Sequence, residues 1–277
     1  MELLRYVTIG QFIPRDSPVH RLDPRTKLLA VAVWMVIIFL VRDFLGYALF
    51  TLVLLALLAV AQIPLGYVLK GLRPVLFLLV LTLALNILFS GPAEGKVLWR
   101  LGPFVATQEG LIRGLFVGYR LVLLVVVTSL LTFTTSPVDL TDGIERLLRP
   151  FRRLGVPAHE LAMMMTIALR FIPTLLSETE KIIKAQMARG ADFERGNLLR
   201  RARAFIPVLV PLFLSAFRRA EELALAMEAR CYRGGENRTR MKQLTFRSGD
   251  IFAWIFVALA SALFLVPASV WATLAGR

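Results

Sequence analysis

The side chains that could perform chemistry in this chain are few, and they form no catalytic pattern. His20 and His159 are the only histidines, Cys231 is the only cysteine, and neither histidine has a partner at the spacing of a metal site. A single cysteine also excludes an intrachain disulfide. We therefore expect no metal, no cofactor and no nucleophilic triad, and we expect His20 to belong to a structural arm.

The stretch that comes nearest to a phosphate-binding loop runs from Gly91 to Val97 and contains Lys96. It is one residue shorter than such a loop, and no serine or threonine follows the lysine to bind Mg²⁺. If ATP drives this protein, a partner must therefore bind the nucleotide.

Two arginines at the ends of similar stretches favour recognition rather than catalysis. Segment 173–177 (PTLLS) leads to Ala188-Arg189-Gly190, and segment 211–215 (PLFLS) leads to Ala229-Arg230-Cys231. An arginine presents a planar fork of donors to carboxylates or carbonyl groups, and a small alanine beside it allows close approach. The alternative is ordinary helix capping, in which glycine follows the last turn and arginine complements the helix dipole. The two interpretations are compatible.

The elements that must position these arginines are apolar helices. The chain is 57% hydrophobic, whereas soluble domains are roughly 45–50% apolar. We predict five membrane spans from the uncharged runs. The first helix is expected to start early, with Asp23 as its N-cap and Pro24 in the first helical position. The fourth span is expected to be entered from Gly114. The runs cover residues 28–41, 44–69, 74–93, 121–138 and 251–276. The uncharged run 205–217 is too short to span and contains two prolines.

The distribution of basic residues predicts the orientation. The net charge is +14, and residues 139–250 hold 20 of the 33 lysines and arginines. Lysine and arginine are retained on the cytoplasmic side of membranes, so we expect a cytoplasmic N-terminus, with segments 1–27, 70–73 and 139–250 inside. This explains the basic excess without nucleic-acid binding.

These patterns predict an all-α, polytopic membrane protein with three regions. An N-terminal arm and four membrane helices occupy residues 1–138, a cytoplasmic region of long helices occupies 139–250, and a last membrane helix occupies 251–277. The cytoplasmic region contains two apolar stripes at helical spacing, one after Pro157 and the other from Phe205 to Met227.

Over essentially its whole length, the sequence resembles the transmembrane T component of energy-coupling factor (ECF) transporters, a family that includes the cobalt-permease Q-like proteins. Three features carry the resemblance: the arm from Ser17 to Lys27, the motif Ala188-Arg189-Gly190, and Ala229-Arg230 within the segment from Met227 to Gly234.

The resemblance implies a non-catalytic scaffold in the cell membrane. Such a subunit joins two cytoplasmic ABC-type ATPases to a membrane-embedded substrate-binding protein, the S component, for uptake of a vitamin or metal ion. It implies that the two motifs end long coupling helices and that each docks into one ATPase. Cys231 stands where the family usually has glycine, so we expect the second helix to continue past Arg230 and end near Gly234-Gly235.

Two other functions fit less well. An independent secondary transporter or channel usually carries ionisable groups near the membrane midplane, whereas these spans are nearly free of charge. The exception is Arg120, which we expect near one end of its span, where its side chain can snorkel to the membrane surface. A membrane-embedded lipid enzyme would need organised carboxylates, but those of segments 178–194 and 221–228 alternate with lysine and arginine, as solvated helix faces do.

Overall fold

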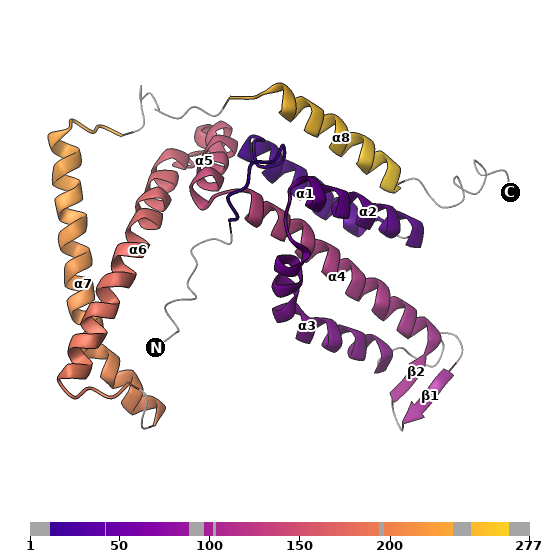
Figure 1. Cartoon of the computed structure of the whole chain (residues 1–277), viewed down its shortest axis with the longest axis horizontal. Helices are drawn as coiled ribbons and strands as arrows, with labels where there is room; N and C mark the ends of the chain where they lie inside the picture. The colour runs from indigo at the N-terminus through magenta and orange to yellow at the C-terminus, as the bar shows by residue number, and fades with distance from the viewer. Residues whose placement is uncertain are drawn as a thin grey trace. The chain divides into compact units, whose positions relative to one another are not determined.

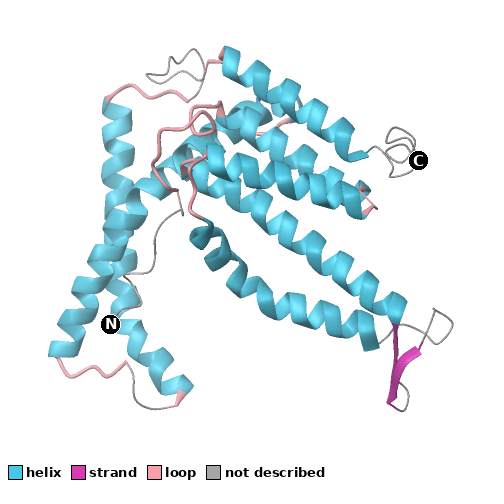
Figure 2. Cartoon of the chain, turned by 45° about the vertical axis from the view of Figure 1, so that its right-hand side comes forward, coloured by secondary structure: helices cyan, strands magenta, loops and turns pink. Residues whose placement is uncertain are grey.

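The computed structural model describes residues 12–41, 43–88, 97–101, 104–193, 197–234 and 245–265. In these residues the secondary structure is almost entirely helical (Figures 1 and 2), which confirms the all-α class. The elements are α1 (Pro24–Leu40), α2 (Phe44–Val60), α3 (Leu65–Leu88), β1 (Val97–Leu101), β2 (Phe104–Thr107), α4 (Gln108–Thr134), α5 (Pro137–Leu148), the 3₁₀ helix η1 (Arg149–Leu154), α6 (Ala158–Ala188), α7 (Leu198–Ala229) and α8 (Ser248–Leu265).

The chain divides into two compact units, one within residues 9–143 and 244–277 and the other within residues 144–243. The first contains α1 to α4, the start of α5 and α8, and the second contains the end of α5, η1, α6 and α7.

Helix α1 begins where the sequence predicts. The Asp23 carboxylate accepts a hydrogen bond from the Arg25 amide at 2.9 Å, and Pro24 occupies the first helical position. Proline suits this position because its missing N–H would have no partner inside the helix. The helix then turns Trp34 and Ile38 into the core.

The core of the first unit lies where α1, α2, α4 and α8 meet. Trp34 and Phe50 contact edge to face at 5.7 Å between ring centroids, and Phe50 lies 4.6 Å from the ring of Phe264. Gly46 permits this approach of α2 and α8, because a Cβ there would lie 2.7 Å from a Val41 methyl carbon and 3.1 Å from the Phe264 carbonyl oxygen.

The predicted run 44–69 is not one helix. Helix α2 ends at Val60, Gln62 adopts a left-handed φ of 55°, and the amide of Ile63 donates to the Leu58 carbonyl at 3.1 Å. This is a Schellman-type end, and Pro64 follows it as proline often does. The predicted cytoplasmic loop 70–73 is therefore wrong: it lies inside α3, as does Pro74, and the connection between α2 and α3 is residues 61–64, nine residues earlier.

The segment between α3 and α4 contains a two-stranded antiparallel hairpin, β1 and β2. Helix α4 is longer than predicted, because Thr107 caps it by accepting from the Gly110 amide at 3.2 Å. Arg120 consequently lies in the middle of α4 rather than near one end. Its guanidinium donates to the Tyr47 hydroxyl at 3.0 Å and covers the Phe39 ring at 5.4 Å.

Four described helices are long and apolar enough to cross a membrane, namely α3, α4, α6 and α8, and α2 is a shorter apolar helix. A described helix overlaps each of the five predicted spans, as expected of a polytopic membrane protein. Helix α6 meets the same criterion of length and composition, although the charge distribution assigns it to the cytoplasm. Helix α7, which contains the run 205–217, does not meet it.

Candidate functional site

Helices α6 and α7 pack against each other in opposite directions (Figure 1). Gln186, near the end of α6, donates to the carbonyl of Pro207, near the start of α7, at 3.5 Å. Tyr232, just beyond α7, donates to the sulfur of Met163, near the start of α6, at 2.9 Å. The final turns of the two helices therefore lie at opposite ends of the pair, and a helix of this length spans roughly 45 Å at 1.5 Å per residue.

The end of α6 is a complete Schellman motif. Ala188 is the last helical residue, Arg189 is the C-cap, and Gly190 has a left-handed φ of 88°. The Gly190 amide donates to the Met187 carbonyl at 2.9 Å, and the Ala191 amide donates to the Gln186 carbonyl at 3.0 Å. Backbone groups thus cap these carbonyls.

The end of α7 repeats this geometry. Ala229 is the last helical residue, Arg230 is the C-cap, and Cys231 takes the left-handed position with φ 56°. The Cys231 amide donates to the Glu228 carbonyl at 2.8 Å, and the Tyr232 amide donates to the Met227 carbonyl at 3.0 Å.

The predicted extension of α7 to Gly234-Gly235 is therefore wrong. The two backbone hydrogen bonds and the contact between Tyr232 and Met163 fix the end of the helix at Ala229. These interactions offset the unfavourable left-handed conformation of a residue with a side chain, which costs roughly 1–2 kcal/mol. Capping geometry therefore does not distinguish the two ends, although their third residues differ.

The two arginines have the same backbone conformation, and both are exposed. Arg189 has φ −87° and ψ 6°, and Arg230 has φ −90° and ψ 13°. Both residues are exposed, as are the alanines before them. No described residue accepts a hydrogen bond from either guanidinium, whereas the neighbouring backbone already satisfies the last carbonyls. Helix capping alone therefore leaves both guanidinium groups unused.

An apolar surface on α7 has no cover within the described part of its unit. This surface consists of exposed large apolar side chains, namely Phe205, Ile206, Leu209, Val210, Phe213, Leu214 and Phe217. On the side of α7 toward α6, Val208 is buried and Leu212 is half-buried. Exposed apolar surface on this scale is characteristic of a protein or membrane contact.

Two carboxylates of this unit, Glu145 and Glu178, form ion pairs. Glu178 accepts from the Ser215 hydroxyl and from the Arg219 guanidinium, the latter at 3.0 Å. Glu145 lies 3.1 Å from His159 Nδ1. Across the described ranges, no group of three or more histidine, cysteine, aspartate or glutamate side chains could hold a metal ion. The glycine- and lysine-containing stretch at residues 91–96 lies outside the described residues.

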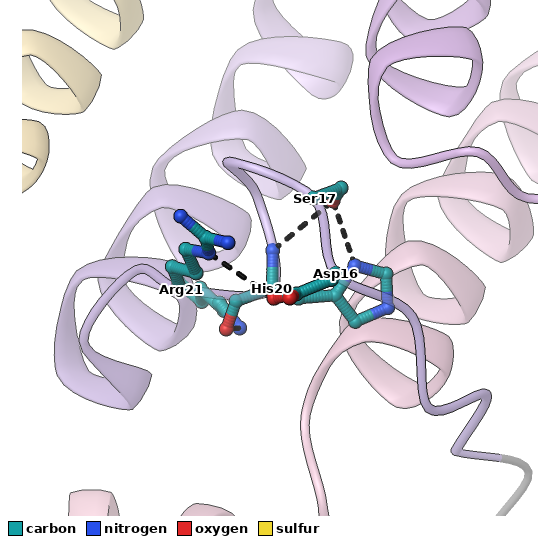
Figure 3. A network of polar contacts seen from close by, with 5 residues as sticks. Asp16, Ser17, His20 and Arg21 are labelled. Carbon is teal, nitrogen blue, oxygen red and sulfur yellow. Dashed lines mark hydrogen bonds and ion pairs between the residues drawn. The ribbon is translucent and has the colours of Figure 1, made fainter.

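The N-terminal arm ahead of α1 folds around His20 (Figure 3). His20 Nε2 lies 3.1 Å from the Ile13 carbonyl, so it must donate, and Nδ1 lies 2.7 Å from the Ser17 hydroxyl, which can donate to it. Asp16 and Arg21 form an exposed ion pair at 3.1 Å beside it. Partial burial and the nearby Lys27 ammonium lower the pKa of His20, so the neutral ring suits both contacts.

Buried charges join this arm to the start of α8. The Asp250 carboxylate accepts from the Asp23 amide and from the Arg247 amide, each at 2.8 Å. The Lys27 ammonium donates to the Thr134 carbonyl at 2.8 Å and to the His20 carbonyl at 3.0 Å. We call these contacts, with those of His20, the arm base. Sequence reasoning missed Asp250, whose one signal is a lone carboxylate immediately before an apolar run.

Comparison with known proteins identifies the family of this chain. The family described as cobalt transport protein (CbiQ) matches residues 15–241. The energy-coupling factor transporter transmembrane protein EcfT of Thermosediminibacter oceani is 56% identical over 268 residues, covering 97% of this chain and 100% of that protein. EcfT of Bacillus subtilis is 46% identical over 94% of this chain and 98% of that protein. The chain therefore belongs to the cobalt transport protein family, as a transmembrane T component of energy-coupling factor transporters.

Proposed function

We propose that this subunit couples two cytoplasmic ABC-type ATPases to a membrane-embedded S component and so drives import of a vitamin or metal ion. Ala188, Arg189 and Gly190 form one docking motif, and Ala229 and Arg230, with Cys231 in the third position, form the other. The observation that carries the proposal is the repeated end: two exposed arginines, on matching caps, whose side chains the caps do not use.

The placement of the two ends supports two separate ATPase contacts. The ends lie at opposite ends of an antiparallel pair, roughly 40 Å apart, so a single groove of ordinary size does not receive both. Each guanidinium can donate several hydrogen bonds to carboxylates or carbonyl groups of its ATPase. Because α6 and α7 are packed together, a movement imposed on one end is transmitted to the other helix.

The S component is proposed to rest against the apolar surface of α7. The exposed residues between Phe205 and Phe217 form an uncharged face, which suits an apolar membrane protein better than a hydrated ATPase surface. The cargo then reaches the cell through the S component, and this chain needs no substrate site of its own. Under this proposal the chain is a multi-pass cell-membrane protein with the N-terminus and both docking motifs in the cytoplasm.

Co-purification tests the docking role. The tagged full-length chain is expressed with its ATPases and S component, as wild type and as Arg189→Glu/Arg230→Glu. We expect the charge reversal to remove most of both ATPases, because a negative group replaces the donor fork. The matched control Arg170→Glu/Arg218→Glu reverses two other exposed arginines on the same helices and should retain both.

Unchanged recovery of both ATPases with the Arg189→Glu/Arg230→Glu chain would contradict the docking role. Solute uptake by the isolated chain in liposomes without ATP would instead support an independent secondary transporter.

A further inference from the structure

Four arginines surround an open hollow at the start of the second unit. The hollow has a volume of about 660 Å³ and is lined by Arg146 at the end of α5 and by Arg149, Pro150, Arg152 and Arg153 of η1. The segment from Ile144 to Val156 contains these four arginines and only one acidic residue, a glutamate. No described carboxylate forms an ion pair with Arg149 or Arg153. The hollow therefore suits an anion.

The helical repeat arranges the segment in rows. A 3₁₀ helix has three residues per turn, so side chains three apart lie above one another. Arg149 and Arg152 form one such row, which Arg146 extends into the preceding turn of α5. Phe151 and Leu154 form a neighbouring row, and 49% and 79% of these residues are exposed, respectively. An arginine row thus lies directly beside an exposed apolar row.

We propose that this segment binds the phosphate of an anionic phospholipid at the membrane surface. The guanidinium groups of Arg149 and Arg153 donate to the headgroup phosphate, and Phe151 and Leu154 enter the boundary between headgroups and acyl chains. A hydrated acidic protein surface would leave the apolar row without a contact, whereas a lipid surface satisfies both rows. The proposal is independent of ATPase docking, because it uses neither Arg189 nor Arg230.

The position of the arginine-lined segment along the chain fits an anionic phospholipid as its ligand. Helix α4, which is long and apolar enough to cross a membrane, ends at Thr134, twelve residues before Arg146. Clusters of basic residues close to the cytoplasmic end of a span attract anionic lipid, and the attraction fades within a Debye length of the surface.

Native mass spectrometry of the full-length chain in detergent tests the site. The probes are phosphatidylglycerol, phosphatidylcholine and inorganic phosphate. We expect wild type to retain phosphatidylglycerol in preference to phosphatidylcholine, and Arg149→Ala/Arg153→Ala to bind phosphatidylglycerol roughly 30-fold more weakly. Arg149→Lys/Arg153→Lys, which keeps both charges, should retain most of the binding. The control Arg170→Ala/Arg218→Ala removes the same charge from α6 and α7 and should bind like wild type.

Three results would overturn the proposal. Equal losses in Arg149→Ala/Arg153→Ala and in the control would show that only total charge matters. Displacement of phosphatidylglycerol by an equal concentration of inorganic phosphate would identify free phosphate as the ligand. Unchanged lipid binding by Arg149→Ala/Arg153→Ala, together with loss of ATPase co-purification, would assign the segment to an acidic protein surface.

Discussion

The arm base and the α6–α7 pair handle charge in opposite ways. In the arm base, Asp250 is 1% exposed and Lys27 is 7% exposed, and both are held by backbone groups from distant parts of the chain. In the α6–α7 pair, Arg189 and Arg230 are exposed at helix ends whose backbone already caps itself. The first arrangement stabilises this chain, and the second leaves donors available to another molecule.

Stability and function can therefore be separated by mutation in this protein. A buried charge that loses its partners leaves unsatisfied groups inside the protein, which is strongly destabilising. An exposed charge is solvated whether or not a partner is present, so its removal barely alters folding. Substitutions in the two regions test this separation.

Asp250→Ala should lower the free energy of unfolding by about 3 kcal/mol, because it leaves the amides of Asp23 and Arg247 without their acceptor and removes a buried negative charge. The measurement is chemical unfolding in detergent followed by circular dichroism. Ile251→Ala, a change at the exposed neighbouring residue, is the control. If the two variants unfolded at the same denaturant concentration, the arm base would not have the stabilising role assigned to it.

Arg230→Ala should weaken binding of one ATPase by roughly 30-fold, an effect of about 2 kcal/mol typical of a central interface residue. The same change should alter the free energy of unfolding by less than about 0.5 kcal/mol. Surface-immobilised chain and purified ATPase give the affinity. A large loss of stability would mean that the arginine supports the fold, and the comparison with Asp250 would fail.

Cys231→Gly should raise the free energy of unfolding by about 0.5–1 kcal/mol, because glycine adopts the left-handed φ of 56° without steric cost. Gly190→Ala at the equivalent position of α6 should lower it by a similar amount, since φ there is 88°. Both are measured by chemical unfolding in detergent. Destabilisation by Cys231→Gly would show that the cysteine side chain itself supports the end of α7.

Acidification should weaken the arm slightly. The folded protein lowers the pKa of His20 below its usual value near 6.5, so the neutral ring contributes stability that is complete above pH 6.5. That contribution is lost as the pH falls through the lowered pKa. Thermal unfolding at pH 7.5 and at pH 5.5 should differ less for His20→Gln, which keeps a donor but cannot titrate. If the unfolding temperature changed by the same amount between the two pH values in wild type and variant, His20 would be excluded as the cause.

Local sequence signals predicted the elements well where short-range chemistry decides them. Asp23-Pro24 identified the start of α1, and Ala188-Arg189-Gly190 identified the end of α6, because caps involve residues a few positions apart. The same reasoning failed at Cys231, where the predicted helix extension does not occur, and at residues 44–69, where Gln62 takes the left-handed position that glycine usually fills.

Composition and periodicity are properties of neighbouring residues, so the amino-acid pattern alone predicts an apolar, strongly basic, helical chain with two arginine-ended helices. The contact between Asp23 and Asp250, which are 227 residues apart, follows from the tertiary structure, as does the antiparallel pairing that places Arg189 and Arg230 at opposite ends. The tertiary structure also decides that Arg120 binds Tyr47. Such contacts depend on which helices pack together, and packing is decided by surfaces assembled from the whole chain rather than by any local pattern.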